Sequence, residues 1–214
     1  MSSSSVGTFF HRYADTFDSL YDGRRTRFMQ WVDRRWRSDM FVRFALTFEM
    51  LPDLKGKRVL DIGCGSGPYV VEALRRGAAS VTALDAAPGM LDLARRRVEV
   101  MQRSADVVFV EGIFPSGCPA GAWDAAIVMG VMDYVDDPVT FVRTVREVAG
   151  SAVFSFPSRH WFRTPVRKVR YRLRRCPVWF FDERRIREVM RQAGVDSCEI
   201  RKIPGAGMDY VVRL

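Results

Sequence analysis

A glycine-rich stretch and one acidic residue further along the chain are the residues best suited to chemistry. The stretch is Val-Leu-Asp-Ile-Gly-Cys-Gly-Ser-Gly at residues 59–67, between an apolar run typical of a strand and a segment of helical composition. Glycines here allow a tight turn and let a ligand approach main-chain N–H groups. Asp85 ends the next apolar run, 22 residues after Gly63, where a carboxylate can accept hydrogen bonds from both ribose hydroxyls. Together they predict a site for an adenosine-containing ligand.

The glycine spacing distinguishes this turn from a dinucleotide-binding turn. It is Gly-x-Gly-x-Gly with an acidic residue two positions before the first glycine, whereas dinucleotide enzymes carry Gly-x-Gly-x-x-Gly. Residues 59–67 resemble the first motif of class I S-adenosylmethionine-dependent methyltransferases, and Asp85 resembles their second motif. The stretch Trp-Asp-Ala-Ala-Ile-Val-Met at residues 123–129 resembles the fourth strand of that family. The resemblance therefore covers residues 55–156 motif by motif.

A narrower likeness indicates the class of acceptor. Residues 10–21 and the run Met-Gly-Val-Met-Asp-Tyr-Val at residues 129–135 look most similar to small-molecule O-methyltransferases of quinone and magnesium-protoporphyrin biosynthesis. This likeness implies a methyltransferase that modifies a small aromatic or isoprenoid acceptor at oxygen.

The resemblance also implies which residues hold the co-substrate, S-adenosylmethionine. Residues of the turn face the amino-acid half: Asp61, Gly63, Cys64, Gly65 and the helix-start Gly67. Residues at and after the end of the second strand face the ribose and adenine: Asp85, Ala86 and Met90. Residues at the end of the fourth strand line the methionine portion: Met129 and Gly130.

The stretch after the third predicted strand departs from the family pattern. The family often carries Gly-Asp there, whereas this chain has Glu-Gly-Ile-Phe at residues 111–114. We therefore expect Gly112 and Ile113 to recognise adenine through backbone and apolar contacts rather than through a carboxylate.

Few side chains are placed to act as a general base. A sulfonium is already an activated methyl donor, so the protein has mainly to hold the acceptor in line and to remove the proton of a hydroxyl acceptor. Asp133 and Tyr134 follow the fourth predicted strand, and His160 follows the fifth. These three are the candidate catalytic residues. The alternative roles are a helix-start cap for Asp133 and an exposed loop position for His160.

The elements that must position these residues alternate from residue 57 onward. Short apolar runs predict strands and the segments between them predict helices, which indicates an α/β, Rossmann-like, mostly parallel sheet. The resemblance implies seven strands in the order 3-2-1-4-5-7-6, the last strand antiparallel. The strands are expected at 59–62, 81–84, 107–110, 125–129, 152–154, 197–203 and 208–214, and the helices at 69–76, 89–102, 138–148 and 183–193.

Two helices are expected ahead of the sheet, so residues 1–54 are predicted as an N-terminal helical cap and residues 55–214 as the methyltransferase domain. The second helical pattern ends near Leu51. The first carries an aromatic stripe at the spacing of one helical face. This stripe is either core packing or a lid that places Tyr13 over the donor and excludes water. Its members are Phe10, Tyr13, Phe17 and Tyr21.

A basic, aromatic insertion is predicted at residues 158–181. It contains eight lysines and arginines and no acidic residue. Three interpretations remain open: a solvated lid helix, a surface for an anionic acceptor or an anionic membrane that carries the acceptor, and a nucleic-acid surface. Nucleic acid is the weakest expectation, since no Asn-Pro-Pro-Tyr-like tetrad follows the fourth strand.

Composition limits the remaining classes. The 214 residues, 48% of them hydrophobic and with a net charge of +9, suffice for one folded domain with additions. Four cysteines without a CxxC pair and two histidines predict neither a disulfide framework nor a metal site. No signal-peptide pattern is present, nor the roughly 18 apolar residues of a bilayer span. We expect a cytoplasmic protein with peripheral attachment to the inner face of the membrane, and no oligomeric state is predicted.

Two other functions remain open from the sequence. One is an RNA methyltransferase that uses the basic insertion. The other is a nucleotide-binding or S-adenosylmethionine-binding protein without transferase activity.

Overall fold

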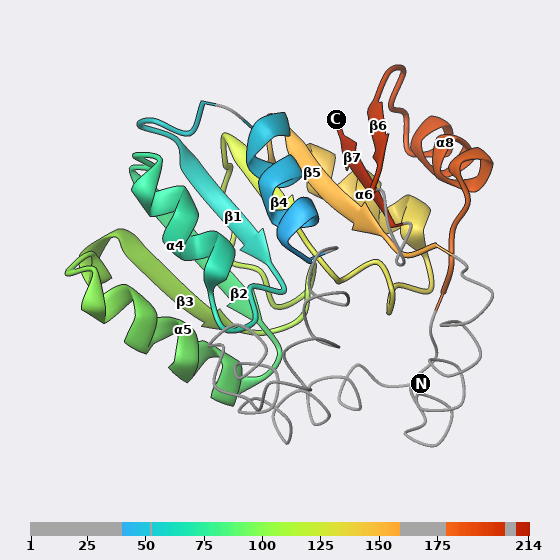
Figure 1. Cartoon of the computed structure of the whole chain (residues 1–214). Helices are drawn as coiled ribbons and strands as arrows, with labels where there is room; N and C mark the ends of the chain where they lie inside the picture. The colour runs from blue at the N-terminus through green and yellow to red at the C-terminus, as the bar shows by residue number, and fades with distance from the viewer. Residues whose placement is uncertain (1–39, 52, 159–178, 204–208) are drawn as a thin grey trace, which may run out of the picture.

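Seven strands form one mixed sheet in the computed structural model, which describes residues 40–51, 53–158, 179–203 and 209–214 (Figure 1). The strand order is β3-β2-β1-β4-β5-β7-β6. β7 runs antiparallel to both of its neighbours, and all other pairs are parallel. This order and the C-terminal hairpin confirm the sequence prediction. The strands are β1 (Arg58–Ile62), β2 (Ser80–Asp85), β3 (Val107–Glu111), β4 (Ala125–Val128), β5 (Ala152–Phe156), β6 (Glu199–Lys202) and β7 (Tyr210–Arg213).

The helices begin at residues that favour helix starts. Proline occupies the first turn of α4 (Pro68–Arg75), α5 (Pro88–Val100) and α6 (Pro138–Val148), where its missing N–H costs nothing. Asp182 caps α8 (Glu183–Gln192) by accepting from the Arg185 N–H at 2.7 Å. The predicted helices are confirmed to within two residues at each end. The short 3-10 helix η1 (Ser104–Asp106) was not predicted.

Helices cover both faces of the sheet, and each face has its own apolar core. A helix over residues 40–50 packs with α4 and α5 on one face, and α6 and α8 pack on the other (Figure 1). Strands β1, β4 and β5 are buried on both faces except at Arg58. Their near-continuous apolar sequences follow from this double burial.

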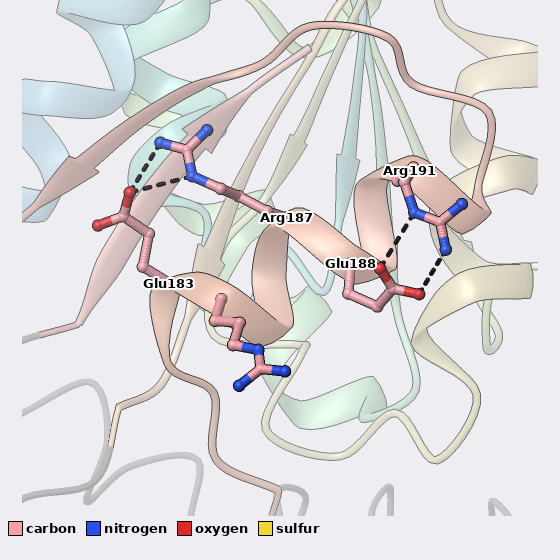
Figure 2. A pocket seen from close by; sticks show the side chains of 5 residues that line it. Glu183, Arg187, Glu188 and Arg191 are labelled. Carbon is pink, nitrogen blue, oxygen red and sulfur yellow. Dashed lines mark hydrogen bonds and ion pairs between the residues drawn. The ribbon is translucent and has the colours of Figure 1, made fainter.

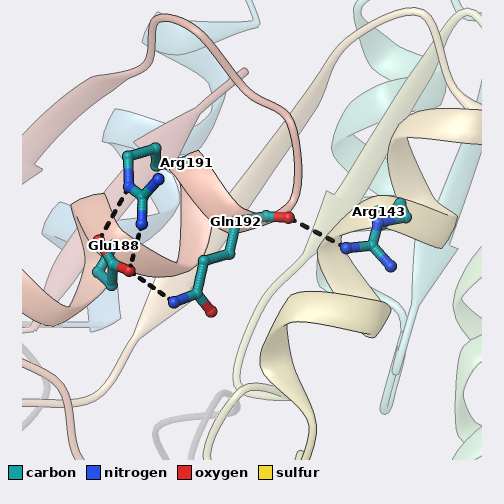
Figure 3. Close-up of polar contacts among 4 residues, drawn as sticks. All are labelled: Arg143, Glu188, Arg191 and Gln192. Carbon is teal, nitrogen blue, oxygen red and sulfur yellow. Dashed lines mark hydrogen bonds and ion pairs between the residues drawn. The ribbon is translucent and has the colours of Figure 1, made fainter.

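Two arginines of α6 fasten α8 to the second face. Arg143 donates to the carbonyl oxygen of Gln192 at 3.0 Å (Figure 3), and Arg146 donates to the carbonyl oxygen of Ala193 at 2.9 Å. Cations at a helix C-terminus satisfy carbonyl groups that lack helical partners. α8 is thus fixed against α6 on the side of the sheet opposite the helix at 40–50.

Several sequence predictions lie outside the described residues: Tyr13 with its aromatic stripe, His160, and most of the basic insertion. Among the helices of the described ranges, none combines the length and the apolar character that a membrane crossing requires.

Candidate functional site

The glycine-rich turn connects the carboxyl end of β1 to α4 and is fastened to the neighbouring strand. The N–H groups of Gly63 and Cys64 donate to the carbonyl oxygen of Leu84, at the end of β2, at 2.8 and 3.0 Å. All three glycines have positive φ, at +71° for Gly63, +54° for Gly65 and +81° for Gly67. L-residues rarely adopt this conformation, so the turn requires glycine.

Each glycine of the turn has a different neighbour. A Cβ on Gly63 would lie 2.5 Å from Cγ2 of Val131, and one on Gly67 would lie 2.8 Å from Cβ of Ala94 in α5. A Cβ on Gly65 would meet nothing within 4 Å. Packing therefore requires Gly63 and Gly67, while the space beside Gly65 is open to a ligand.

Asp85 links the end of β2 to this turn. Its two carboxylate oxygens accept from the N–H groups of Gly65 at 2.8 Å and Ala87 at 2.9 Å. Burial raises the pKa of Asp85, and the hydrogen bonds from these backbone N–H groups lower it. The carboxylate is consequently held in a fixed orientation beside Gly65, with further lone pairs available for hydroxyl donors.

Asp61, the last-but-one residue of β1, is a buried carboxylate without a donor. Its residue is 1% exposed, and no described residue hydrogen-bonds to either carboxylate oxygen. Burial, together with the nearby negative charge of Asp85, raises the pKa of Asp61 to about 8. An unpartnered buried carboxylate is costly. The arrangement therefore favours a ligand that brings a positive charge to this point.

The thiol of Cys64 is also buried in the turn. Burial raises its pKa well above the ordinary value, and the charges of Asp61 and Asp85 raise it further. A thiol in this environment is unreactive, so Cys64 serves the site by packing.

A polar cluster from the N-terminal helix lies next to Asp61, and sequence reasoning missed it. The Arg43 guanidinium and the Thr47 hydroxyl, both on the helix at 40–50, act on the hydroxyl of Tyr69 in α4. The Thr47 hydroxyl donates to the Arg43 carbonyl oxygen at 2.8 Å. Burial raises the pKa of Tyr69, the nearby Arg43 guanidinium lowers it, and the charge of Asp61 raises it. The arginine-rich composition of residues 24–43 concealed Arg43, because nothing in the pattern separates it from surface arginines.

Residues that follow the carboxyl end of β4 form another side of the candidate site. Met129 is buried, and its sulfur lies 3.4 Å from the Thr47 hydroxyl. Gly130 has φ +74°, and its N–H donates to Oγ of Ser155 at 2.7 Å. Ser155 is a buried residue of β5 that holds the backbone turn after Met129, and it too was absent from the sequence prediction.

The predicted adenine residues gather after β2 and β3. Met90 packs with Ala87 in a small apolar cluster, and Ala86 is half-buried beside Asp85. Gly112 donates its N–H to the Asp85 carbonyl oxygen at 3.0 Å, so that amide is already engaged. Ile113 is 36% exposed and presents apolar surface at this edge.

The predicted catalytic residues Asp133 and Tyr134 lie in the loop after β4. Asp133 is buried, and its carbonyl oxygen accepts from the Trp179 N–H at 2.9 Å. The helix cap that follows is Asp137, whose side chain accepts from the Thr140 N–H at 3.0 Å. Asp133 therefore does not cap α6.

Both flanks of the basic insertion are anchored to described residues near the carboxyl end of β5. The Ser158 N–H, just after β5, donates to Oδ1 of Asp209 at 3.1 Å. On the returning side, Phe181 donates its N–H to the Pro157 carbonyl oxygen at 2.8 Å. The insertion thus leaves and rejoins the described fold at the carboxyl edge of β4 and β5.

A shallow hollow on the exposed face of α8 is a weaker candidate for a site (Figure 2). It is lined by charged groups that already pair along the helix, Arg187 with Glu183 and Arg191 with Glu188, each at 2.7 Å. No buried or strained polar group faces it among the side chains that line it. The carboxyl ends of β1, β2 and β4, with the buried Asp61 and the open turn at Gly65, are the stronger candidate for the site.

Residues 22–199 match the family described as a methyltransferase domain. The chain belongs to that family. It is 27% identical over 214 residues to the ubiquinone biosynthesis O-methyltransferase of Aromatoleum aromaticum, a match that covers 94% of this chain and 82% of the relative. It is 41% identical over 92 residues to the enzyme of the same name from Methylocella silvestris, covering 42% of this chain and 34% of that relative. Over its matched part the chain therefore spans about a third of the second relative's length.

A solved structure shares the whole fold. Magnesium protoporphyrin IX methyltransferase from Synechocystis, crystallised with S-adenosylhomocysteine, superposes with a TM-score of 0.76 at 18% identity. The match covers 99% of this chain and 98% of that chain. The class I methyltransferase fold expected from the sequence is confirmed.

Proposed function

We propose that the protein transfers the methyl group of S-adenosylmethionine to an oxygen of a small acceptor. One observation carries the donor assignment: the buried carboxylate of Asp61, without a described hydrogen-bond donor, beside a turn open at Gly65. A zwitterionic amino acid presents an ammonium group, which is the partner that Asp61 lacks. The ammonium would donate to the carboxylate and stabilise its ionised form.

The opposite charge needed for such a zwitterion is close by. The charge of Arg43 acts on the Tyr69 phenol, and the charge of Asp61 acts on the same phenol. Asp61 for the ammonium and Arg43 for the carboxylate give the donor's amino-acid half one counter-charge at each end. Met129 then lines the methionine chain, and Asp85 accepts from the ribose hydroxyls.

The chain has few tasks in the chemical step. The sulfonium supplies an activated methyl group, whose bond to sulfur breaks as the new carbon–oxygen bond forms. Asp133, buried in the loop after β4, takes the hydroxyl proton of the acceptor, directly or through Tyr134 beside it. General-base assistance of this kind contributes about 10²-fold to 10⁴-fold.

We assign the acceptor to the aromatic, quinone-related compounds that the names of the relatives indicate. The basic insertion supports a further step, in which an anionic membrane surface presents the acceptor. Its eight basic residues lie between Ser158 and Trp179, both anchored beside the acceptor side of the site. Each arginine near an anionic bilayer contributes about 1 kcal/mol. The protein would then act from the inner face of the membrane without crossing it.

The transferase assignment is tested by incubating the protein with methyl-labelled donor and a cell extract separated into lipid, water-soluble small-molecule, RNA and protein fractions. We expect label in the lipid or small-molecule fraction, in an alkali-stable methyl ether. Label in the RNA fraction would show that the acceptor is a nucleic acid and not a small molecule. If the protein binds the donor but no fraction takes up label, the protein is a binding protein without transferase activity.

The membrane step is tested with vesicles of phosphatidylglycerol and of phosphatidylcholine. We expect binding to the anionic vesicles, weakened by added salt, and little binding to the neutral ones. Charge reversal at Arg167 and Arg170 should weaken vesicle binding and leave donor affinity unchanged, while the same change at Arg184 and Arg187 on α8 serves as the matched control. Equal binding to both vesicle types would remove the membrane from the proposal.

A further inference from the structure

Ser155 is a buried polar residue inside an otherwise apolar strand. The sequence of β5 is Ala-Val-Phe-Ser-Phe, all of it buried, and Ser155 is 2% exposed. Its oxygen accepts from the Gly130 N–H at 2.7 Å, which fixes the turn after Met129. This bond uses one of the two lone pairs of the hydroxyl and leaves its proton unexplained.

The proton of this hydroxyl has no acceptor within the part of the chain that the structure describes. Thr47, a buried hydroxyl on the helix at 40–50, solves the same problem by donating to the Arg43 carbonyl oxygen at 2.8 Å, one helical turn earlier. Ser155 has no such route, because β5 is paired with a strand on each side. A buried hydroxyl proton without an acceptor is costly. The position therefore favours a ligand that brings an oxygen to it.

The register of the sheet places Ser155 on the same face as Asp61 and Met129. Asp61 pairs with Ile127 of β4, and Ile127 pairs with Val153 of β5. Met129 follows Ile127 by two residues, and Ser155 follows Val153 by two residues, so each pair shares a face. Ile127, Met129 and Val153 also belong to one apolar cluster. The three groups therefore form a row across β1, β4 and β5.

This row follows the order of the groups in the proposed reaction. Neighbouring strands are about 4.8 Å apart, so Ser155 lies two strands, about 10 Å, across the sheet from Asp61, with Met129 between them. Asp61 is proposed to bind the ammonium group of the donor and Met129 to line its methionine chain. The next position across the sheet then belongs to the acceptor, beyond the methyl group. Space is open there, because a Cβ on Gly130 would meet nothing within 4 Å.

We propose that the Ser155 hydroxyl donates its proton to the reacting oxygen of the methyl acceptor. This inference rests on the proposed function. A hydroxyl acceptor has one proton and two lone pairs: Asp133 takes the proton, one lone pair accepts from Ser155, and the other attacks the methyl group. The electron pair of the broken carbon–sulfur bond stays on sulfur, which becomes a neutral thioether. Ser155 thus orients the nucleophile, and the Gly130 N–H keeps Ser155 in place.

The test measures methyl transfer with saturating labelled donor and a dilution series of the extract fraction, lipid or small-molecule, that the wild type labels. In Ser155→Ala we expect the rate at low amounts of this fraction to fall about tenfold, the change expected from losing one hydrogen bond to an oxygen that carries negative charge. Calorimetry should show less than twofold change in affinity for S-adenosylhomocysteine, which carries the amino-acid group, and for 5′-methylthioadenosine, which lacks it.

Two further variants make the test specific. Ser155→Thr keeps a hydroxyl on a residue type that strands favour and should recover most of the rate. Thr82→Val is the matched control, because the Thr82 hydroxyl of β2 also accepts from an N–H, that of the Trp123 indole at 3.0 Å. Thr82 pairs with Leu60, whose side chain belongs to the core of the opposite face. Its substitution should change neither the rate nor the two affinities.

Each other outcome overturns the inference. An unchanged rate in Ser155→Ala would do so directly. A selective loss of S-adenosylhomocysteine affinity would show that the hydroxyl binds the carboxylate of the donor instead. An equal loss for both ligands would show that Ser155 only holds the turn after Met129. If Ser155→Ala does not fold, Ser155→Cys decides on the same criteria. A wild type that binds S-adenosylhomocysteine but labels no fraction would overturn the proposed function itself, and this inference with it.

Discussion

The two halves of the sheet's carboxyl edge are built differently. On the side of β1, β2 and β3, the hydrogen bonds that fix the site are donated by backbone N–H groups. Those of Gly63 and Cys64 donate to the Leu84 carbonyl oxygen. Those of Gly65 and Ala87 donate to the Asp85 carboxylate. On the side of β4 and β5, a buried Asp133 accepts from the Trp179 N–H, at one of the two anchored flanks of a basic insertion. In the proposed function, the first half holds the donor and the second half holds the acceptor.

This difference has a physical origin. A turn that must approach a ligand closely depends on positive φ and missing Cβ atoms, which few sequences can provide. An acceptor pocket depends on side chains projecting from loops, which many sequences can provide. Substitutions on the donor side should therefore affect ligand affinity, and substitutions on the acceptor side should affect turnover.

The largest effect is expected from Gly65→Ala. The new Cβ meets no protein atom but occupies the open space beside the turn, so affinity for S-adenosylhomocysteine should fall more than 100-fold, on the order of 3 kcal/mol. Gly56→Ala is a matched control, because Gly56 has φ +69° and is equally open. Both variants should lose about 1 kcal/mol of stability from the left-handed backbone. Calorimetry showing equal affinity in the two variants would break the assignment of the donor half.

The next effect is on the acceptor side, in Asp133→Asn. Loss of the base should lower kcat by about 10²-fold with a hydroxyl acceptor. Donor affinity, measured by titration, should stay within twofold of the wild type. A variant that binds the donor poorly but keeps kcat would show that Asp133 belongs to the donor side of the site and is not the general base.

A pH dependence of about tenfold per unit is expected for donor affinity. The pKa of Asp61 is raised from 3.8 to about 8 in the free protein, so Asp61 carries a proton at neutral pH. The donor's ammonium favours the ionised form, and binding must release that proton below pH 8. Affinity should therefore rise roughly tenfold per pH unit from 6 to 8 and then level off. Calorimetry in buffers of different ionisation enthalpy measures the released proton directly.

Asp61→Asn sharpens the same prediction. Its affinity should be lower than that of the wild type at pH 8 and nearly independent of pH. Stability should respond in the opposite sense: a group with a raised folded-state pKa loses its stabilising contribution as pH rises from about 4 to 8. The wild type should become less stable relative to Asp61→Asn across that range, by about 6 kcal/mol at most. A pH-independent wild-type affinity would contradict the assignment of Asp61.

The smallest effect is expected at Asp137. Removing the cap of α6 in Asp137→Ala should cost about 1 kcal/mol of stability, seen as a lower melting temperature. Donor affinity and kcat should both remain at wild-type values, because Asp137 is an exposed cap beyond both halves of the site. A loss of turnover without a loss of stability would show that the loop from Asp133 to Asp137 has a function of its own.

The sheet could be predicted because its signals are local. Runs such as residues 125–128 are apolar throughout because both faces are covered, and proline marks three helix starts. The predicted alternation needed no tertiary information beyond the family resemblance. The helix η1 was missed since three residues leave no periodicity to detect.

The polar cluster could not be predicted because its members are distant in sequence. Arg43, Thr47 and Tyr69 have ordinary local contexts, and their meeting depends on how the N-terminal helix packs on α4. Ser155 was likewise hidden inside an apolar strand, and its partner, the Gly130 N–H, comes from the turn after the neighbouring strand β4. Asp61 was found from the motif alone, but its lack of a donor is visible only in three dimensions.

The central claim is that the turn, Asp61 and Asp85 form a site for S-adenosylmethionine, and titration of the wild-type protein with S-adenosylhomocysteine at pH 8 tests it most directly. The account predicts one site per chain with a dissociation constant of micromolar order, about −8 kcal/mol. A folded protein that melts cooperatively and shows no binding at millimolar ligand would contradict it.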